Sequence, residues 1–295
     1  MRFLGGFICL CGSLFVLSLS SQPDLTPIEE DGITPIEQGI NWVKLGCTPP
    51  VSPRHINTGC GCCFAIVAVQ NLESVVLIET GKYSRLSVQE VIDCLGKCKK
   101  GLLYGCKGGF MSEAFTYMMM NGLASDIDYP INLIRRQGPC QAADKPRAIQ
   151  PADKPKPGAI QVIEWDQFLG HDDYVKRLRT DPPVPVEDQF KIALFTSPLS
   201  VRFNVNKYFV RYDGKTIIEH HQCPPPRKGK GHNHALLLVG FGTDSRGNKF
   251  WLVQNTWGAG WGRNGYALLR RGGDPRGVGG ITAGFACRPV IKKSP

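Results

Sequence analysis

The 295-residue chain lacks several features that would assign it to particular classes of protein. After its first apolar run we find no other segment that we expect to cross a bilayer, so we predict no membrane contact once that run is removed. The net charge is +10, but it is spread over short clusters, with no basic helix interleaved with aromatic residues, so we predict no nucleic-acid partner. The chain also has no N-x-S/T acceptor with x other than proline, so N-glycosylation is not expected.

Residues 1–21 have the features of a secretory signal peptide. Arg2 precedes an apolar run from Phe3 to Leu19, and small residues follow at the expected cleavage site. A short membrane anchor is the alternative, but the run is short for a span and no cationic stop follows it. We therefore predict entry into the secretory pathway.

The chain has twelve cysteines, and ten remain if the predicted signal is removed. In an oxidising compartment most of these should form disulfides. Three of them, Cys60, Cys62 and Cys63, fall within four positions and are set between glycines. Such a group can supply disulfide partners, metal ligands or a reactive nucleophile.

Zinc binding is one use that this cysteine group could have. His220, His221 and Cys223 could add further imidazole and thiolate ligands. However, C-x-C-C does not have the usual ligand spacing, and cysteines of the secretory pathway oxidise. We therefore expect no metal and no other cofactor.

Apolar periodicity predicts helices in the first half of the chain and strands in its last third. Helical spacing covers 63–80, 87–94 and 111–122, and Ser87 with Glu90 forms a capping box at the start of the second helix. Helices followed by antiparallel strands predict an α+β fold of two lobes with a cleft between them as the natural site. The runs with strand composition are LSVRFNV, ALLLVGFG, FWLVQN and YALLRR.

A local duplication rich in Lys and Pro lies in the middle of the chain. ADKPRAIQ at 143–150 is repeated as ADKPKPGAIQ at 152–161, and neither copy can build a core, so we interpret the region as a loop insertion. The predicted organisation is an acidic leader at 22–40, a helical lobe at about 41–140, the insertion at about 141–165 and a β-rich lobe at about 166–295.

Cys63, His234 and Asn255 together suggest nucleophilic chemistry. Cys63 lies at the predicted start of a buried helix, where backbone N–H groups and the helix dipole favour a thiolate. His234 opens the apolar strand HALLLVGFG and could act as its acid/base partner, and Asn255 could hold the imidazole while Trp257 shields their bond. Each residue alone has an ordinary structural explanation, so the hypothesis depends on the set.

The motifs around these residues resemble those of the papain-like cysteine peptidases, of papain and cathepsin type. NTGCGCCF is similar to the family's Q-G-x-C-G-S-C-W, HALLLVGFG to H-A-V-x-x-V-G-Y-G, and NTWGAGWG to N-S-W-G-x-x-W-G. YGCKGG resembles the Y-G-C-N-G-G motif, and INWVKLG near residue 40 resembles the mature N-terminus. The resemblance covers the chain from about residue 40 to its end and implies a helical lobe followed by an antiparallel, β-barrel-like lobe.

The resemblance implies a role for each residue of the set. Cys63 would attack the peptide carbonyl as a thiolate, His234 would give its proton to the leaving amine, and Asn255 would orient the imidazole. The Cys63 backbone N–H and one side-chain amide would meet the oxyanion. The residues implied to contact substrate are Gly108 and Gly109 along the peptide backbone, Phe110, Met111 and Ala235 in an apolar pocket for the second residue before the cut, and Trp257.

Partners and location also follow from the resemblance. The substrates would be peptides or proteins, cystatin-like proteins are candidate inhibitors, and a monomer located outside the cell or in a lysosome or vacuole is expected. An exopeptidase would need an element that occludes the cleft, and the insertion over 141–188 could provide one. No cofactor is implied.

The family's disulfides would pair Cys60 with Cys106 and Cys94 with Cys140. A third would begin at Cys223, but its usual partner position holds Gly279 or Gly280. The candidate substitute is Cys287, several residues later.

Three departures from the family pattern support a second hypothesis. Asn57, one methylene shorter than glutamine, stands at the position of the oxyanion amide, and Cys62 replaces the serine before the nucleophile. Only about twenty residues lie where relatives carry an inhibitory pro-region of about a hundred. The alternative is therefore a catalytically impaired relative that binds peptides or inhibitors.

Overall fold

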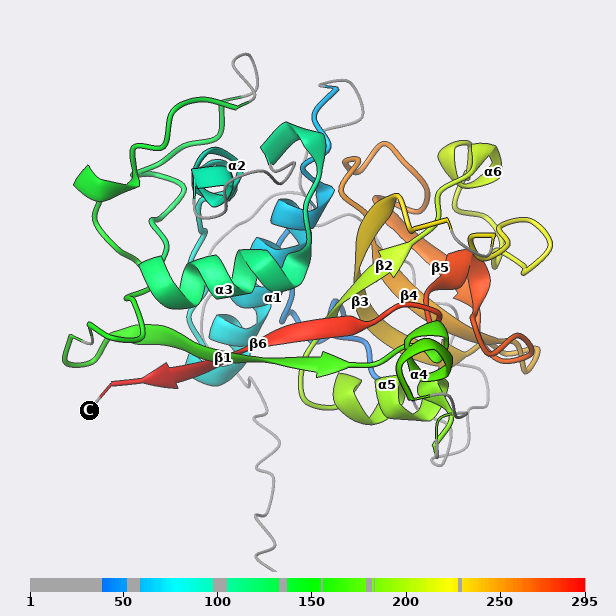
Figure 1. The fold of residues 1–295 in the computed structure, drawn as a ribbon. Coiled ribbons are helices and arrows are strands. Elements are labelled where there is room, and N and C mark those ends of the chain that lie inside the picture. The colour runs from blue at the N-terminus through cyan, green and yellow to red at the C-terminus, as the bar shows by residue number, and fades with distance from the viewer. Residues whose placement is uncertain are drawn as a thin grey trace, which may run out of the picture.

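The computed structural model shows a helical lobe beside a β-rich lobe (Figure 1). Helices α1, α2 and α3 lie on one side of the view and strands β2 to β5 on the other, while β1 and β6 run along the base of the helical lobe. This arrangement confirms the α+β, two-lobed fold expected from the sequence. The residues described are 39–51, 59–97, 105–132, 137–154, 156–178, 182, 184–227 and 230–294.

Helix α1 (Cys63–Thr80) is the central helix of the helical lobe. Its residues from Phe64 to Val76 are all buried, and Gly81 ends it in the left-handed conformation with φ 68°. By length and composition alone α1 could cross a membrane, since its mean hydropathy is 1.5, but 72% of it is buried inside the protein. Its apolar character therefore reflects a position in the core.

Helices α2 (Val88–Cys94) and α3 (Met111–Asn121) complete this lobe, and the boundaries agree with the predicted ranges. The Ser87 hydroxyl accepts a hydrogen bond from the Glu90 N–H at 3.0 Å, so the first half of the capping box is present.

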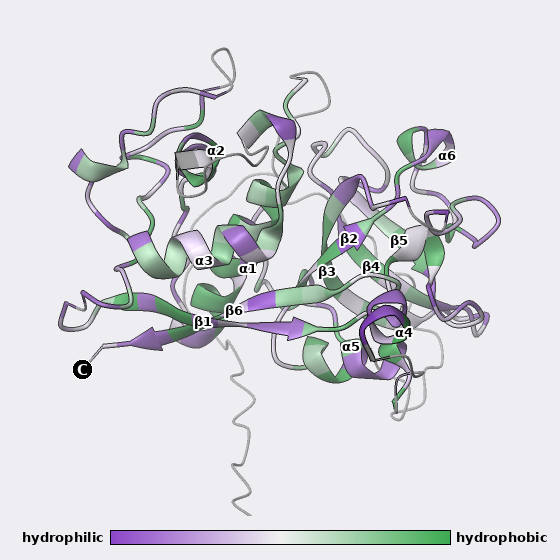
Figure 2. Cartoon of the chain, viewed as in Figure 1, coloured by the Kyte–Doolittle hydropathy of each residue, from purple (hydrophilic) through white to green (hydrophobic). Residues whose placement is uncertain are grey.

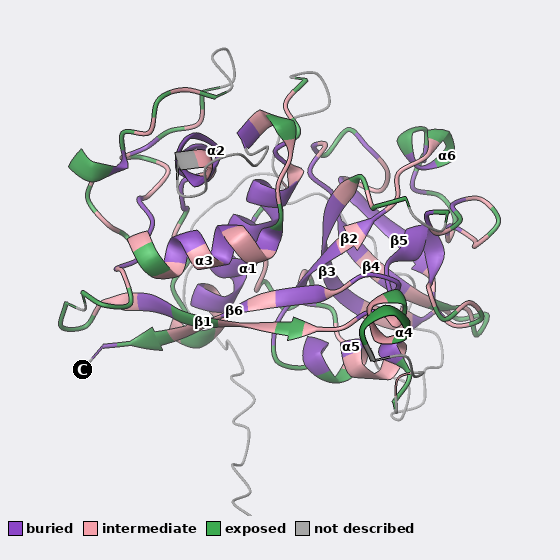
Figure 3. Cartoon of the chain, in the orientation of Figure 1, coloured by how far each residue is buried: buried purple, intermediate pink, exposed green. Residues whose placement is uncertain are grey.

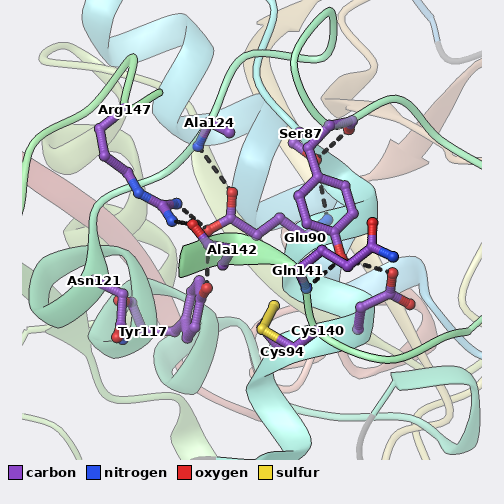
Figure 4. A network of polar contacts seen from close by, with 12 residues as sticks. Ser87, Glu90, Cys94, Tyr117, Asn121, Ala124, Cys140, Gln141, Ala142 and Arg147 are labelled. Atoms are coloured by element: carbon purple, nitrogen blue, oxygen red, sulfur yellow. Dashed lines mark hydrogen bonds and ion pairs between the residues drawn. A yellow bond between two sulfur atoms is a disulfide. The ribbon is translucent and has the colours of Figure 1, made fainter. Parts of the chain in front are cut away.

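In a complete capping box the Glu90 carboxylate would also accept a hydrogen bond from the Ser87 N–H. It does not do so here. It accepts hydrogen bonds from the Ala124 N–H at 2.9 Å and the Tyr117 hydroxyl at 2.8 Å, and it forms an ion pair with Arg147 (Figure 4). The second half of the predicted box is therefore replaced by a buried network that links α2 to α3 and to the segment after it.

A six-stranded antiparallel sheet has the order β1-β6-β2-β3-β4-β5. Strands β2 to β5 coincide with the four predicted strand runs. The two others, β1 and β6, were not predicted, and β1 begins within the stretch interpreted as a loop insertion. Because β1 pairs with the end of the chain, its sheet partner is more than a hundred residues away. The strands are β1 (Ile160–Phe168), β2 (Leu199–Phe203), β3 (His234–Thr243), β4 (Lys249–Gln254), β5 (Tyr266–Arg270) and β6 (Ala286–Lys293).

Three further helices, also not predicted, lie in the described part of the second half of the chain. Helices α4 (His171–Leu178) and α5 (Val186–Leu194) lie between β1 and β2, and the short α6 (Lys207–Val210) follows β2. Short 3-10 turns occupy Leu95–Lys97, Gly105–Lys107, Ala142–Asp144 and Val278–Gly280.

Strand β3 belongs to the cores of both lobes because its side chains alternate between two faces. Ala235, Leu237 and Val239 pack in the cluster that contains α1, whereas Leu236 and Leu238 pack in the cluster of the β-rich lobe. The apolar, buried character of α1 and β3 is visible in the hydropathy and burial views (Figures 2 and 3). The first residue of β3, His234, thus lies where the two lobes meet.

Among the described residues, two disulfides stabilise the helical lobe. Cys60 is bonded to Cys106 and Cys94 to Cys140, each closing a sequence separation of 46 residues. These are the pairs that the resemblance implied.

The suggested bond between Cys223 and Cys287 is wrong, because both residues are buried thiols. Cys287 packs in the helical-lobe cluster and Cys223 in the β-lobe cluster, on the two faces of the sheet. Cys223 does lie beside Gly279, whose N–H donates to its carbonyl at 2.6 Å. A Cβ at Gly279 would lie 2.2 Å from the Phe203 ring, so this ring fills the space where a bonded cysteine would stand.

Candidate active site

Cys63 is the first residue of α1, and the loop before it is tightly held. The Cys60–Cys106 disulfide closes that loop, and the Gly61 N–H donates to the Cys106 carbonyl at 2.8 Å. A Cβ at Gly61 would meet the same carbonyl oxygen at 3.1 Å and the Gly108 nitrogen at 3.3 Å. Glycine at 61 therefore lets the 105–108 turn approach the start of α1.

His234 and Asn255 come from neighbouring strands and form a hydrogen bond. His234 begins β3, and Asn255 follows the last residue of β4. The His234 Nε2 lies 2.8 Å from the Asn255 Oδ1, and this oxygen also accepts from the Thr256 N–H at 2.8 Å. Asn255 is fully buried, and its own N–H donates to the Gly265 carbonyl, so its side chain has a fixed position from which to orient the imidazole.

Trp257 covers this hydrogen-bonded pair. Its ring centroid is 5.0 Å from that of His234, with a 36° angle between the planes. Trp257 is supported in turn by edge contacts with Phe209 and Trp261 at 5.7 and 5.5 Å. The shielding role suggested for Trp257 thus agrees with its position.

The Cys63 thiol and the His234 imidazole shift each other's pKa in opposite directions. Burial alone would raise the pKa of Cys63, but the charge and hydrogen bond of His234 and the N–H groups of Ala235 and Phe64 lower it overall. Burial alone would lower the pKa of His234, but Cys63 and the Asn255 oxygen raise it. Both shifts favour a thiolate–imidazolium pair, which is a nucleophile beside its own proton donor.

Cys62, the neighbouring thiol, lies in an environment that shifts its pKa in the opposite direction. It is buried, and burial together with the nearby Cys63 raises its pKa to about 12. Cys62 therefore remains a protonated thiol under conditions in which Cys63 ionises.

The residues predicted to contact substrate lie around this pair. Gly108 has φ +107° and open space where a Cβ would be, and a Cβ at Gly109 would lie 2.6 Å from the Phe64 ring. Phe110, which precedes α3, is 49% exposed, whereas Met111 and Ala235 are each 2% exposed. Phe110 thus offers an accessible ring, and the other two form part of a buried apolar wall.

Asn57 lies outside the described residues, so its proposed oxyanion role stays a prediction. The other partner of that role, the Cys63 N–H, is at the first turn of α1, where backbone donors have no intrahelical acceptor.

One residue at this site was missed by the sequence reasoning. Arg202 in β2 is directly opposite Ala235 in β3, so their side chains lie on the same face of the sheet. The available signal was a single charged residue inside the otherwise apolar strand LSVRFNV.

Comparison with known proteins identifies the family. The family described as "Papain family cysteine protease" matches residues 36–286, which include Cys63, His234 and Asn255. The chain belongs to the papain family. Fruit bromelain of Ananas comosus is 28% identical over 267 residues, and cysteine protease 1 of Oryza sativa subsp. japonica is 31% identical over 271 residues. Each alignment covers 90% of this chain.

Solved structures of papain-family proteins support the same conclusion. The bromelain protease of Ananas comosus in complex with the E64 inhibitor has a TM-score of 0.67 and 28% identity, and the match covers 86% of this chain and 99% of that one. The curated relatives are longer: the aligned part covers 64% of fruit bromelain and 47% of the rice protease.

Proposed function

We propose that this papain-family protein is a cysteine endopeptidase that hydrolyses peptide bonds through Cys63, His234 and Asn255. The observation that carries the proposal is the His234 imidazole, which is hydrogen-bonded to the buried amide of Asn255 and lowers the pKa of the Cys63 thiol. The lowered pKa of Cys63 and the raised pKa of His234 support the same assignment.

In the first half of the reaction, the Cys63 thiolate attacks the peptide carbonyl carbon. The carbonyl oxygen becomes an oxyanion near the Cys63 N–H and, by the sequence prediction, the amide of Asn57. His234 then donates its proton to the leaving amine, and the C–N bond breaks to leave a thioester on Cys63.

In the second half, His234 acts as a base. It takes a proton from water, and the resulting hydroxide attacks the thioester carbonyl carbon. The carboxylic acid leaves, and the thiolate–imidazolium pair is restored. Asn255 keeps the imidazole ring in one orientation throughout, and Trp257 limits water access to their hydrogen bond.

The substrate would lie along the 108–111 segment. Its backbone would follow Gly108 and Gly109, and the second side chain before the cut would enter the pocket formed by Phe110, Met111 and Ala235. The exposure of Phe110 and the open space at Gly108 support this placement.

A location in the secretory pathway, outside the cell or in a lysosome or vacuole, completes the proposal. The two disulfides support it, since such bonds persist in oxidising compartments. We expect a monomer and inhibition by cystatin-like proteins.

The test is labelling with E64, the inhibitor found with the bromelain protease, followed by location of the adduct by mass spectrometry. We expect one adduct on Cys63, none in a Cys63→Ala variant and labelling that is slower by roughly 10²-fold or more in a His234→Ala variant. Absence of an adduct on folded, reduced protein would contradict the peptidase proposal and favour the alternative that the Asn57 substitution suggests, a relative that only binds peptides.

A further inference from the structure

Arg202 is an unusual residue for the wall of an apolar pocket. It pairs across the strands with Ala235, the residue after His234, and the same face of β2 carries Ser200, which contacts α1 through Asn71. The Arg202 side chain therefore projects toward the junction of the lobes, next to Ala235, one of the residues proposed to hold the second substrate residue before the cut.

The guanidinium of Arg202 packs against Phe285 and Gly284. Its carbon lies 4.1 Å above the centre of the Phe285 ring, and a Cβ at Gly284 would lie 2.6 Å from its Nε. Only glycine at 284 leaves room for the charged group. Stacking on an aromatic ring suits the flat, weakly hydrated guanidinium.

This guanidinium is incompletely paired. Nη2 donates to the Asp173 carboxylate at 3.1 Å, but Nε is buried without a hydrogen-bond partner among the described residues, and Nη1 makes no hydrogen bond there either. The side chain is 22% exposed, so part of it is open to solvent. Buried donors without acceptors are costly, so an incoming acceptor would gain more here than at an exposed arginine.

The charged groups around Arg202 are of both signs. Asp173 is the direct partner, and Asp172 and Arg177, also on α4, influence Arg202 with opposite signs. His232 lies close by, and burial lowers its pKa, so it adds little positive charge near neutral pH. Burial lowers the pKa of Arg202 and the Asp173 carboxylate acts in the opposite direction, and a guanidinium stays protonated near neutral pH.

We propose that Arg202 makes the subsite for the second residue before the cut selective for an acidic side chain, glutamate above all. The proposal rests on the peptidase function proposed above, and it replaces the purely apolar pocket of the sequence analysis with one that has a cationic wall. A carboxylate is the acceptor that a guanidinium prefers.

The experiment uses three peptides that differ only at that residue, which is Glu, Gln or Leu. The ratio of kcat/KM for Glu to that for Gln isolates the charge, because these side chains have nearly the same shape. We expect a ratio of roughly 10 or more for the natural chain, since a hydrogen bond to a charged group gives about 10- to 100-fold discrimination. Arg202→Met should lower the ratio to about 1, and Arg202→Lys should keep part of it.

Asp173→Asn is the matched control, because it should change the ratio in the opposite direction. The substitution removes the negative charge that competes with a substrate carboxylate for Arg202, so the preference for Glu should increase. If Arg202 only holds α4 in place, the results should differ. Arg202→Met and Asp173→Asn should then both lower the melting temperature, and neither should change the ratio of kcat/KM for Glu to that for Gln. Far-UV circular dichroism shows that each variant is folded.

Direct binding of the same peptides to the Cys63→Ala chain separates this inference from the proposed function. Binding with a Glu preference but no cleavage by the natural chain would overturn the peptidase and keep the subsite. Cleavage with a ratio near 1, or a ratio that Arg202→Met does not change, would overturn the subsite and keep the peptidase. If the peptides are neither cleaved nor bound, both proposals are wrong.

Discussion

Cys62 and Cys63 are neighbours in sequence, yet their environments give them opposite chemistry. Cys62 precedes α1 and is sealed in the core, where burial keeps its thiol protonated. Cys63, one residue later, is partly exposed, and the neighbouring His234 lowers its pKa against the effect of burial. The direction of the side chain at a helix start therefore decides which of two adjacent thiols ionises more readily.

The pH dependence of alkylation tests this difference. With iodoacetamide at pH 6, where ordinary thiols are protonated, we expect Cys63 to react and Cys62 to remain unmodified, as read by peptide mass spectrometry. Because His234 lowers the pKa of Cys63, the reaction should slow only as the pH falls below that lowered value. In a His234→Ala variant the pH below which alkylation of Cys63 slows should move up toward 9. Modification of Cys62, or a step near pH 9 in the natural chain, would contradict the assignment.

Helix α1 carries a buried carboxyl group that connects it to the segment before α2. Glu73 is 4% exposed, and its Oε1 accepts from the Leu86 N–H at 2.7 Å. Burial raises the pKa of Glu73 to about 8, although the Leu86 N–H and the nearby Arg85 act in the opposite direction. Near neutral pH the folded protein therefore holds a proton here that the unfolded chain releases.

Substitution of Glu73 by Gln should change how stability depends on pH. Between the ordinary pKa of 4.5 and about 8, the folded state binds more protons at Glu73 than the unfolded state, so its contribution to stability falls as pH rises. The free energy of unfolding of the natural chain should fall relative to Glu73→Gln by up to about 1.4 kcal/mol per pH unit across this window. Urea unfolding at pH 5, 6, 7 and 8 measures the difference.

The exposed Glu79 of the same helix provides the control. A Glu79→Gln variant should run parallel to the natural chain over the same pH range. If Glu73→Gln does so as well, Glu73 is ionised in the folded protein and the inference from its burial is wrong.

At the scale of the whole molecule, the two lobes share one structural unit. The helical-lobe core includes side chains of β3 and Cys287 of β6, so it cannot form without the sheet. Asn71 of α1 donates to the Ser200 hydroxyl at 2.9 Å and to the Cys287 carbonyl at 3.2 Å, and it is fully buried. We therefore expect the lobes to unfold together.

An Asn71→Leu variant tests this coupling between lobes. Loss of both hydrogen bonds, with the buried Cys287 carbonyl left without that donor, should cost about 1–3 kcal/mol. Far-UV circular dichroism and tryptophan fluorescence should still change in one transition at a lower temperature. Asn121→Leu, at the partly exposed end of α3, is the matched substitution and should cost less than 1 kcal/mol. Two separate transitions in the natural chain would contradict the shared core.

The amino-acid sequence by itself determined those features of the protein that depend on residues close together in the chain. The helices α1 to α3 and the strands β2 to β5 follow from periodicity and caps, because these signals lie within a few residues. The grouping of Cys63, His234 and Asn255 was implied by the resemblance of three separate motifs to those of the papain-like peptidases. The pairing of β1 with β6 was decided only in the tertiary structure, since strand pairing over such a distance leaves little trace in either segment. The separation of Cys223 from Cys287 depends on which face of the sheet each occupies, and the setting of Arg202 depends on Gly284 and Phe285, some eighty residues later. Burial and charge partners arise from such distant contacts, so they appear only once the chain has folded.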